Sequence, residues 1–171
     1  MSEALQPDSG VVVVRSLMKF LAIPGLRLGY AIADRSWVER LERVRDQWSV
    51  SHLAQVAGVV GMQDQAYRDD TANWLRREQQ WVEALWQPSA RYQRHPTSVN
   101  LFLLRWANDE LSRYMSQALF RRGILVRRCR DFEGLGPAYW CIAIRSSAEN
   151  DALYSAGQEF LKEEGDRWLR V

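Results

Sequence analysis

The stretch SLMKFLAIPGLRLGY, residues 16–30, holds the side chains best suited to chemistry. Lys19 stands among apolar residues after a β-branched run, so we expect it to be desolvated. A desolvated amine is a nucleophile that forms a Schiff base with an aldehyde. Arg27 follows a Pro-Gly turn and its guanidinium suits a phosphate, to which Ser16 can add a hydroxyl donor. These groups within twelve positions suit an aldehyde that carries a phosphate, and pyridoxal phosphate is such a molecule.

Lysine is scarce in this chain, which makes Lys19 conspicuous. Of the 23 basic residues only Lys19 and Lys162 are lysines, although codon bias is the simpler explanation of that ratio. The spacing of the segment also fits a second interpretation, in which Lys19 extends its ammonium into water from a strand end and Arg27 pairs with a surface carboxylate. Both interpretations stay open on spacing alone.

The elements that must position this segment alternate between strands and helices. The run Val11 to Val14 predicts a strand buried on both faces, as in a parallel sheet. Two capping-box signatures, Ser36 with Glu39 and Ser146 with Glu149, mark the starts of helices. Further strands are predicted over residues 28–33, 101–106, 124–127 and 139–145, and helices over 37–45, 52–62 and 63–86, between Asn108 and Gly123, and after Ser146.

Composition places the chain among soluble globular proteins and limits its partners. Its 171 residues are 47% hydrophobic and 26% charged, with a net charge of +2, so one self-supporting domain is the first expectation. Basic and acidic residues are interspersed, which argues against nucleic acid as a partner. We find neither an apolar run long enough for a membrane nor a leader peptide, so we expect a cytoplasmic protein.

Cysteine and histidine give no indication of a metal site. Cys129 and Cys141 are too few and too far apart for a zinc site or a disulfide scaffold, and we expect free thiols. His52 falls at a helix start and His95 in a polar stretch, where surface or capping roles are the ordinary ones.

Residues 16–30 resemble the lysine segment of fold type I pyridoxal-phosphate enzymes. Within that class the segment is most similar to threonine-phosphate decarboxylases of cobalamin biosynthesis, whose near relatives are the histidinol-phosphate aminotransferases. The family pattern S-L-T-K-F-x-A-I-P-G-L-R-L-G-Y is matched here with Met18 in place of the threonine. Further matches in family order extend over about residues 11–160, and they are Trp48-Ser49, Ala57-Gly58, Ser98, Asn100, Gly123 to Arg127, and Ala143 to Asn150.

The resemblance implies roles for four residues. Lys19 corresponds to the lysine that binds the cofactor, pyridoxal 5'-phosphate, and later moves protons on the substrate. Ser16 and Arg27 correspond to ligands of the cofactor phosphate, and Arg127 to an arginine that holds anionic groups of the substrate. The implied substrate is a small amino-acid phosphate, whose carboxylate and phosphate explain why several arginines are needed.

Cys141 departs from the pattern at a functional position. The family reads Y-x-R-V-A-I-R near its end, and the first arginine binds the substrate carboxylate through two hydrogen bonds, whereas this chain reads YWCIAIR over residues 139–145. A thiol lacks both the positive charge and the two parallel donors of a guanidinium. The binding free energy of the substrate should therefore weaken by roughly 1.5 to 3 kcal/mol for each charge-assisted hydrogen bond lost. On a continuous strand Arg145 would lie roughly 13 Å away, at about 3.3 Å per residue, and could not replace it. Smaller departures are Gln47, Ser51 and Arg128, the last in a position that the family usually keeps small or acidic.

The second departure concerns what precedes Lys19. In fold type I enzymes the residues that stack on the cofactor ring, pair with its nitrogen and cradle its phosphate in a glycine-rich turn come long before the lysine, and here only eighteen residues precede it. We therefore expect an α/β chain that forms the C-terminal portion of a fold type I enzyme. Residues 1–86 would be the end of the large-domain sheet with its connecting helix, and residues 87–171 a small α+β domain.

Three functional hypotheses follow. The first is a threonine-phosphate decarboxylase-like protein, which would convert L-threonine O-3-phosphate to aminopropanol phosphate once an N-terminal portion completes the site. The second is a pyridoxal-phosphate-dependent aminotransferase of the histidinol-phosphate type. The third is a non-catalytic, degenerate module that keeps a surface for self-association. The expected partners are the small-molecule substrate and either a second copy or the missing N-terminal fragment.

Overall fold

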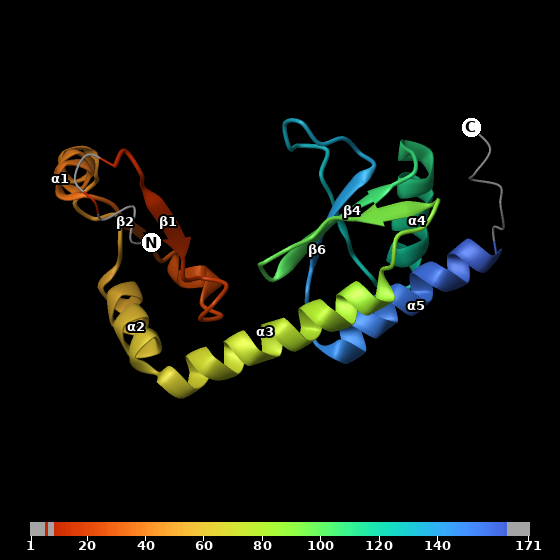
Figure 1. Cartoon of the computed structure of the whole chain (residues 1–171), viewed down its shortest axis with the longest axis horizontal. Helices are drawn as coiled ribbons and strands as arrows, with labels where there is room; N and C mark the ends of the chain where they lie inside the picture. Colours follow the sequence, from red (N-terminus) through yellow and green to blue (C-terminus); the bar gives the residue numbers. More distant parts are fainter. Residues whose placement is uncertain (1–5, 7–8, 164–171) are drawn as a thin grey trace. The chain divides into compact units, whose positions relative to one another are not determined.

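The structure is a computed structural model that describes residue 6 and residues 9–163. The elements in chain order are β1 (Val13–Ser16), η2 (Pro24–Leu26), β2 (Gly29–Ile32), α1 (Arg35–Val44), α2 (His52–Gln63), α3 (Gln65–Leu85), β3 (Tyr92–Arg94), β4 (Leu101–Trp106), α4 (Asp109–Arg121), β5 (Arg127–Arg128), β6 (Tyr139–Ala143) and α5 (Ser147–Glu163) (Figure 1). The chain divides into two units, Met1–Thr71 and Ala72–Val171. The assignment of enzyme domains to residues 1–86 and 87–171 stays a prediction.

The first unit contains an antiparallel pair of strands, β1 and β2. Val13 lies opposite Ile32, and Ser16 lies opposite Gly29. Glycine is needed at position 29, because a Cβ there would lie 2.7 Å from the carbonyl oxygen of Arg15. The buried cluster of this unit is small and consists of Leu17, Leu28 and Ala54.

Helix α2 packs closely against the connection between the two strands because it carries small residues. Ala54 is fully buried, and a Cβ on Gly58 would lie 2.4 Å from a methyl group of Leu28. Ser51 caps the helix by accepting a hydrogen bond from the Ala54 N–H at 3.2 Å. The predicted helix over 52–62 is confirmed.

The prediction of a strand buried on both faces in a parallel sheet is wrong for β1. The strand begins at Val13 rather than Val11, and its partner is antiparallel. Val14 is 75% exposed. Val13 and Ile32, which face each other, are only partly buried, and none of the strand's residues is fully buried. The predicted strand over 28–33 is likewise present as β2 but mostly exposed.

Helix α1 begins earlier than predicted because Asp34 caps it. Asp34 Oδ1 accepts hydrogen bonds from the N–H groups of Ser36 at 2.8 Å and Trp37 at 3.2 Å. The Ser36 hydroxyl, and after it these two N–H groups, hold the pKa of Asp34 below its ordinary value. The capping box predicted from Ser36 and Glu39 is therefore wrong, since Ser36 already lies within the first turn.

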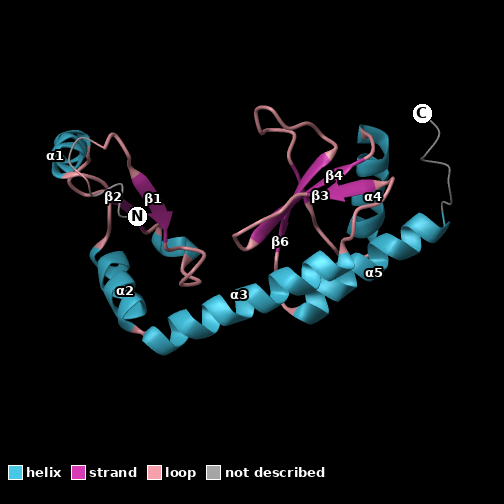
Figure 2. Ribbon diagram, viewed as in Figure 1, coloured by secondary structure: helices cyan, strands magenta, loops and turns pink. Residues whose placement is uncertain are grey.

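The second unit pairs a four-stranded sheet with helices. The strand order is β3-β4-β6-β5, and all neighbours are antiparallel. Helices α4 and α5 and the C-terminal part of α3 contribute apolar side chains to one core with the sheet (Figure 2). Its fully buried members with the largest side chains are Trp86, Trp106, Trp140, Leu104, Leu111, Met115 and Leu119.

Several buried polar side chains of this unit form hydrogen bonds between elements. The indole N–H of Trp140 donates to Ser112 Oγ at 2.8 Å, and the Ser112 hydroxyl donates to the Pro137 carbonyl at 2.6 Å. The buried Glu78 of α3 accepts a hydrogen bond from the Asn150 side chain of α5 at 3.0 Å. These bonds fix α4 on the sheet and α5 on α3, because breaking one would leave a buried group unpaired.

Most sequence predictions for this unit are confirmed. Strand β4 has the predicted bounds, and Asn108 caps α4 by accepting a hydrogen bond from the Leu111 N–H at 2.8 Å. The capping box of Ser146 and Glu149 is present, with their hydroxyl and carboxylate 2.6 Å apart. The long helix predicted over 63–86 is α3.

Two strands are shorter than predicted and one was missed. The strand expected over 124–127 is reduced to β5, because Gly123 has a φ of +78° and the Ile124 N–H returns to the Leu119 carbonyl at the end of α4. Strand β6 ends at Ala143, short of the predicted residue 145. Strand β3 was not predicted, because only one of its three residues, Tyr92, is buried and the sequence pattern there is polar.

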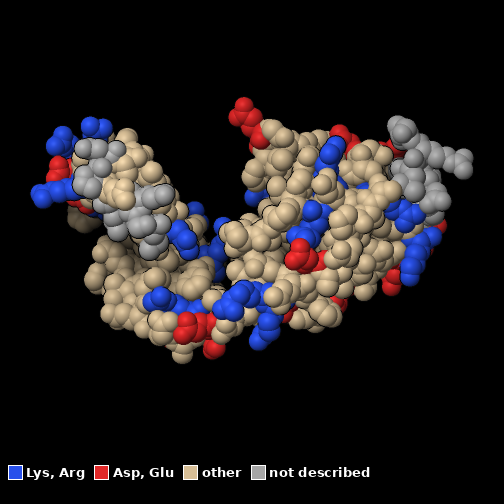
Figure 3. Space-filling view, in the orientation of Figure 1, with Lys and Arg blue, Asp and Glu red and all other residues tan. Residues whose placement is uncertain are grey.

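Charges are mixed over the surface of each unit. Figure 3 shows basic and acidic side chains interspersed on the face drawn, in line with the sequence. Within residues 9–163 no helix is both long enough and apolar enough to cross a membrane.

Candidate functional site

The connection between β1 and β2 carries the three residues predicted to bind the cofactor. Ser16 ends β1, Lys19 lies in the turns that follow, and Arg27 comes directly after η2. Backbone hydrogen bonds close these turns, among them the Leu21 N–H to the Leu17 carbonyl at 2.9 Å. All three side chains are exposed. The structure thus places a hydroxyl, an amine and a guanidinium on one short folded segment.

Lys19 is exposed, which corrects the expectation of a desolvated amine. The apolar residues that flank it turn toward the helices instead. Leu21 lies against Gly61 of α2, and the Phe20 ring meets Tyr67 of α3 edge-on, with centroids 6.4 Å apart. Burial of these neighbours leaves the amine in solvent, so the described residues do not by themselves desolvate it.

Arg27 adopts a backbone conformation that few side chains tolerate. Its φ is +53°, in the left-handed region, and Ala22 in the same connection has a φ of +54°. Such residues cost of the order of 1–3 kcal/mol each and cluster at functional sites. Within the described part of the chain Arg27 forms no ion pair, and its guanidinium donates to the Pro24 carbonyl at 3.4 Å. The surface-carboxylate interpretation of Arg27 therefore finds no support among these residues.

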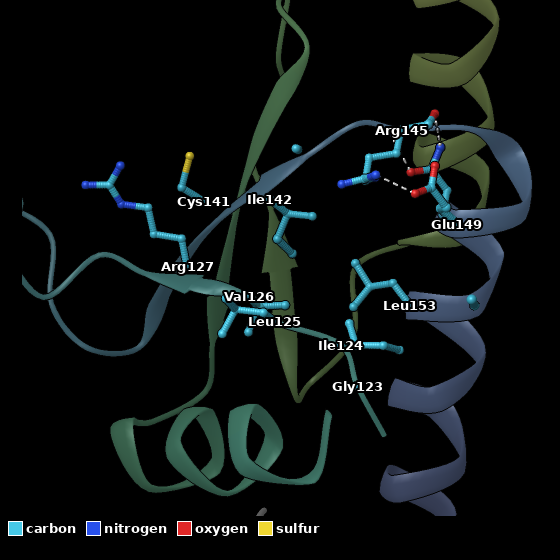
Figure 4. A pocket seen from close by; sticks show the side chains of 13 residues that line it. Gly123, Ile124, Leu125, Val126, Arg127, Cys141, Ile142, Arg145, Glu149 and Leu153 are labelled. Carbon is cyan, nitrogen blue, oxygen red and sulfur yellow. Dashed lines mark hydrogen bonds and ion pairs between the residues drawn. The ribbon is translucent and has the colours of Figure 1, made fainter. Parts of the chain in front are cut away.

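The second unit contains a hollow of about 480 Å³ beside strands β5 and β6 and the start of α5 (Figure 4). Its apolar lining includes Ile124, Val126, Ile142 and Leu153, and its polar side chains include Arg127, Cys141, Arg145 and Glu149. The hollow joins an apolar floor to two guanidinium groups, which suits a small anionic molecule with an apolar part.

Arg127 and Cys141 are neighbours across the sheet in this hollow. They lie directly opposite each other in the β5–β6 ladder. Arg127 Nη2 lies 3.1 Å from Asp131 Oδ2, and the guanidinium is 4.8 Å from the centroid of the Phe132 ring. Arg127 is thus held by a carboxylate and a ring, and Cys141 provides no second charge.

Arg145 and Glu149 also line the hollow. The expected separation of Arg145 from position 141 assumed a strand through residue 145, but β6 ends at Ala143 and the Arg145 N–H turns to the Asn150 side chain at 3.0 Å. The Arg145 guanidinium pairs with Glu149 at 2.6 Å.

The two thiols differ in environment. Cys129 is fully buried, and burial raises the pKa of its thiol. Cys141 is half-buried, and both thiols are free. Among the described residues no group of His, Cys, Asp and Glu side chains is arranged to hold a metal ion.

Two solved structures show the same fold as this chain. The histidinol-phosphate aminotransferase of Clostridium acetobutylicum matches 89% of this chain with 46% of its own, at a TM-score of 0.77 and 23% identity. The L-threonine-O-3-phosphate decarboxylase of Porphyromonas gingivalis matches 92% of this chain with 49% of its own, at a TM-score of 0.74 and 24% identity. The fold is therefore that of a portion of a fold type I pyridoxal-phosphate enzyme, as the sequence predicted.

The chain belongs to the aminotransferase class I and II family, whose model matches residues 2–155. It is 39% identical over 156 residues to the threonine-phosphate decarboxylase of Salmonella typhimurium, covering 90% of this chain and 42% of that protein. It is 26% identical over 162 residues to a histidinol-phosphate aminotransferase of Methanococcus maripaludis, covering 93% of this chain and 43% of that protein. The chain thus spans less than half the length of these curated relatives.

Proposed function

We propose that this chain is the C-terminal portion of a pyridoxal-phosphate-dependent enzyme that acts on a small amino-acid phosphate. The specific activity we propose is that of a threonine-phosphate decarboxylase, which converts L-threonine O-3-phosphate to aminopropanol phosphate in cobalamin biosynthesis in the cytoplasm. The observation that carries this proposal is the 39% identity over 90% of the chain to such a decarboxylase, with Ser16, Lys19 and Arg27 on one folded connection.

The donor set of the β1–β2 connection fits the chemistry of the cofactor. Lys19 offers a primary amine to its aldehyde, while Ser16 and Arg27 offer a hydroxyl and a guanidinium to its phosphate. No described carboxylate competes for Arg27, so its charge is free to meet the phosphate. When bound, the cofactor supplies an electron sink for the bond that breaks in the substrate.

The chain's own residues would then divide the work. Lys19 Nζ would hold the cofactor by its aldehyde, and the same amine would carry a proton to or from the reacting carbon of the substrate. Arg127 orients an anionic group of the substrate over the apolar floor of the 480 Å³ hollow, and to do so its guanidinium exchanges Asp131 for the substrate. Arg145 is a second cation in that hollow, but Glu149 already neutralises it.

Cys141 bears on which substrate the site accepts. A decarboxylase substrate carries both a carboxylate and a phosphate, and the thiol removes the guanidinium expected to bind one of them. An aminotransferase of the histidinol-phosphate type is the second candidate, and it is favoured by the 26% identity to such an enzyme over 93% of this chain. The exposed Lys19 favours the third candidate, a module without catalysis.

Covalent capture of pyridoxal phosphate at Lys19 tests the proposal. The purified chain is mixed with the cofactor and reduced with borohydride, and the modified lysine is identified by peptide mass spectrometry. We expect the label on Lys19, and Lys19→Ala should abolish most of it, whereas Lys162→Ala should leave it unchanged. Lys162 is a matched control because it is the other lysine of the chain and is also exposed.

Equal labelling of the two lysines would mean that the connection has no affinity for the cofactor, and the proposal would fail.

A separate assay distinguishes the two candidate reactions. It uses a complex of the chain with an N-terminal portion or a second copy, the partners we propose. Carbon dioxide released from L-threonine O-3-phosphate supports the decarboxylase, and amino transfer from histidinol phosphate supports the second candidate.

A further inference from the structure

A second hollow in the Ala72–Val171 unit is lined by none of the residues assigned to cofactor or substrate. It has a volume of about 570 Å³ and is lined by Arg113, Arg128 and Arg130 together with Asp109, Glu110 and Pro137. These residues come from the start of α4, from β5 and from the loop between β5 and β6. Arg128 is also a departure from the pattern of the family that the sequence resembles.

Neutral partners position two of the three guanidinium groups. Arg128 donates from Nε and Nη2 to the Pro137 carbonyl, at 3.3 and 3.2 Å. The Arg113 guanidinium lies 4.6 Å from the centroid of the Tyr114 ring. Within residues 9–163 neither these two nor Arg130 forms an ion pair, whereas other arginines of this unit pair with carboxylates. Their charges are therefore left for a ligand.

The three guanidinium groups also oppose one another. Burial lowers the pKa of Arg128, and the charge of Arg130 lowers it further, with a smaller contribution from Arg113, while Asp109 acts in the opposite direction. Arginine stays charged at neutral pH in spite of this. An anion in the hollow would offset the repulsion, so the cluster attracts one.

The two carboxylates in the hollow restrict which anion fits. Three guanidinium groups against Asp109 and Glu110 leave one positive charge in excess (3 − 2 = 1). Guanidinium groups match the oxygens of a phosphate, and carboxylates accept hydrogen bonds from an ammonium group. We propose that this hollow binds an aminoalkyl phosphate, a phosphate monoester that also carries an ammonium group. The proposal does not depend on the proposed enzymatic function.

Calorimetric titration of the full chain with O-phosphoethanolamine tests this site. We expect one site per chain, and we expect Arg128→Ser to weaken binding about tenfold, the effect of a lost charge-assisted hydrogen bond. Arg130 is exposed, so Arg130→Ser should weaken binding without affecting folding and serves as a second variant. Arg121→Ser removes the same charge from the last turn of α4 and should bind as the unaltered chain does.

Three results would overturn the proposal. Affinity that is unchanged in both Arg128→Ser and Arg130→Ser would show that the hollow is not the site. An equal loss of affinity in Arg121→Ser would show that only the net charge of the chain matters. A loss of affinity confined to Arg127→Ser would place the ligand in the 480 Å³ hollow instead. Inorganic phosphate should bind more weakly than O-phosphoethanolamine, and equal affinity would overturn the role given to Asp109 and Glu110.

Discussion

Position 141 shows how one side chain sets what a pocket can bind. Cys141 lies opposite Arg127 in the β5–β6 ladder, so an arginine there would put two guanidinium groups side by side over the same hollow. Such a pair would bind an anion strongly, but the two positive charges would repel each other when no anion is present. With cysteine the hollow has one guanidinium fewer, and Arg127 is neutralised by Asp131.

Restoring the arginine should therefore make stability depend on anions. Like charges directly opposite in a ladder destabilise by about 0.2–1 kcal/mol, so Cys141→Arg should lower the melting temperature in buffer without phosphate. Added phosphate should raise it more than it raises that of Cys141→Ser, the control that removes the thiol without adding charge. Thermal denaturation followed by circular dichroism gives both values, and identical phosphate responses would show that the two arginines do not form an anion site.

At the scale of elements, local signals in the sequence identified most helices and strands. Asn108 and the Ser146–Glu149 capping box mark helix starts because their side chains satisfy backbone N–H groups within a few residues. The failures come from distant partners. The pairing direction of β1 depends on which strand lies beside it. Lys19 is exposed because the apolar residues next to it pack against Gly61 and Tyr67.

The candidate site was predictable to the same extent. Ser16, Lys19 and Arg27 were found because a continuous motif carries them. The placement of Arg145 could not be predicted in this way, since it depends on where β6 ends and on the fold of the chain around Asn150. The hollow of about 570 Å³ is lined by residues from α4 and β5, and no spacing rule in the sequence predicts that these residues lie together.

The start of α5 carries a pH dependence that can be measured. The Ser146 hydroxyl and then Arg145 lower the pKa of Glu149 from 4.5 to about 2. Because the folded state holds this proton less tightly than the unfolded state, the stabilisation is complete above pH 4.5 and is lost as the pH falls from 4.5 to about 2. Glu149→Gln should flatten the free energy of unfolding over this range, measured by urea titration at several pH values. Glu159→Gln, on the same helix but outside the capping box, should retain the slope, and an unaltered slope in Glu149→Gln would contradict the assignment.

At the scale of the whole molecule, the two units differ in how much apolar surface they bury. The core of the Ala72–Val171 unit contains fourteen buried apolar residues, whereas the buried cluster of the Met1–Thr71 unit contains three. In the latter, Leu53 and Val60 of α2 are 73% and 61% exposed. A helix that is apolar on all sides is normally covered on all sides. The first unit therefore has the surface expected of a module that another part of an enzyme or a second copy covers.

Hydrogen exchange followed by mass spectrometry tests this difference within one sample. Amides of β1 and β2 should exchange faster than those of β4 and β6, because a strand pair with a small core opens at little free-energy cost while the central strands of the larger sheet open only with their core. If a second copy covers the first unit, protection in β1, β2 and α2 should rise with protein concentration, and β4 and β6 should serve as the internal reference that does not change. Protection of β1 equal to that of β4 in dilute solution would contradict this expectation. It would show that the first unit is stable without a cover, in spite of its exposed valines and leucines.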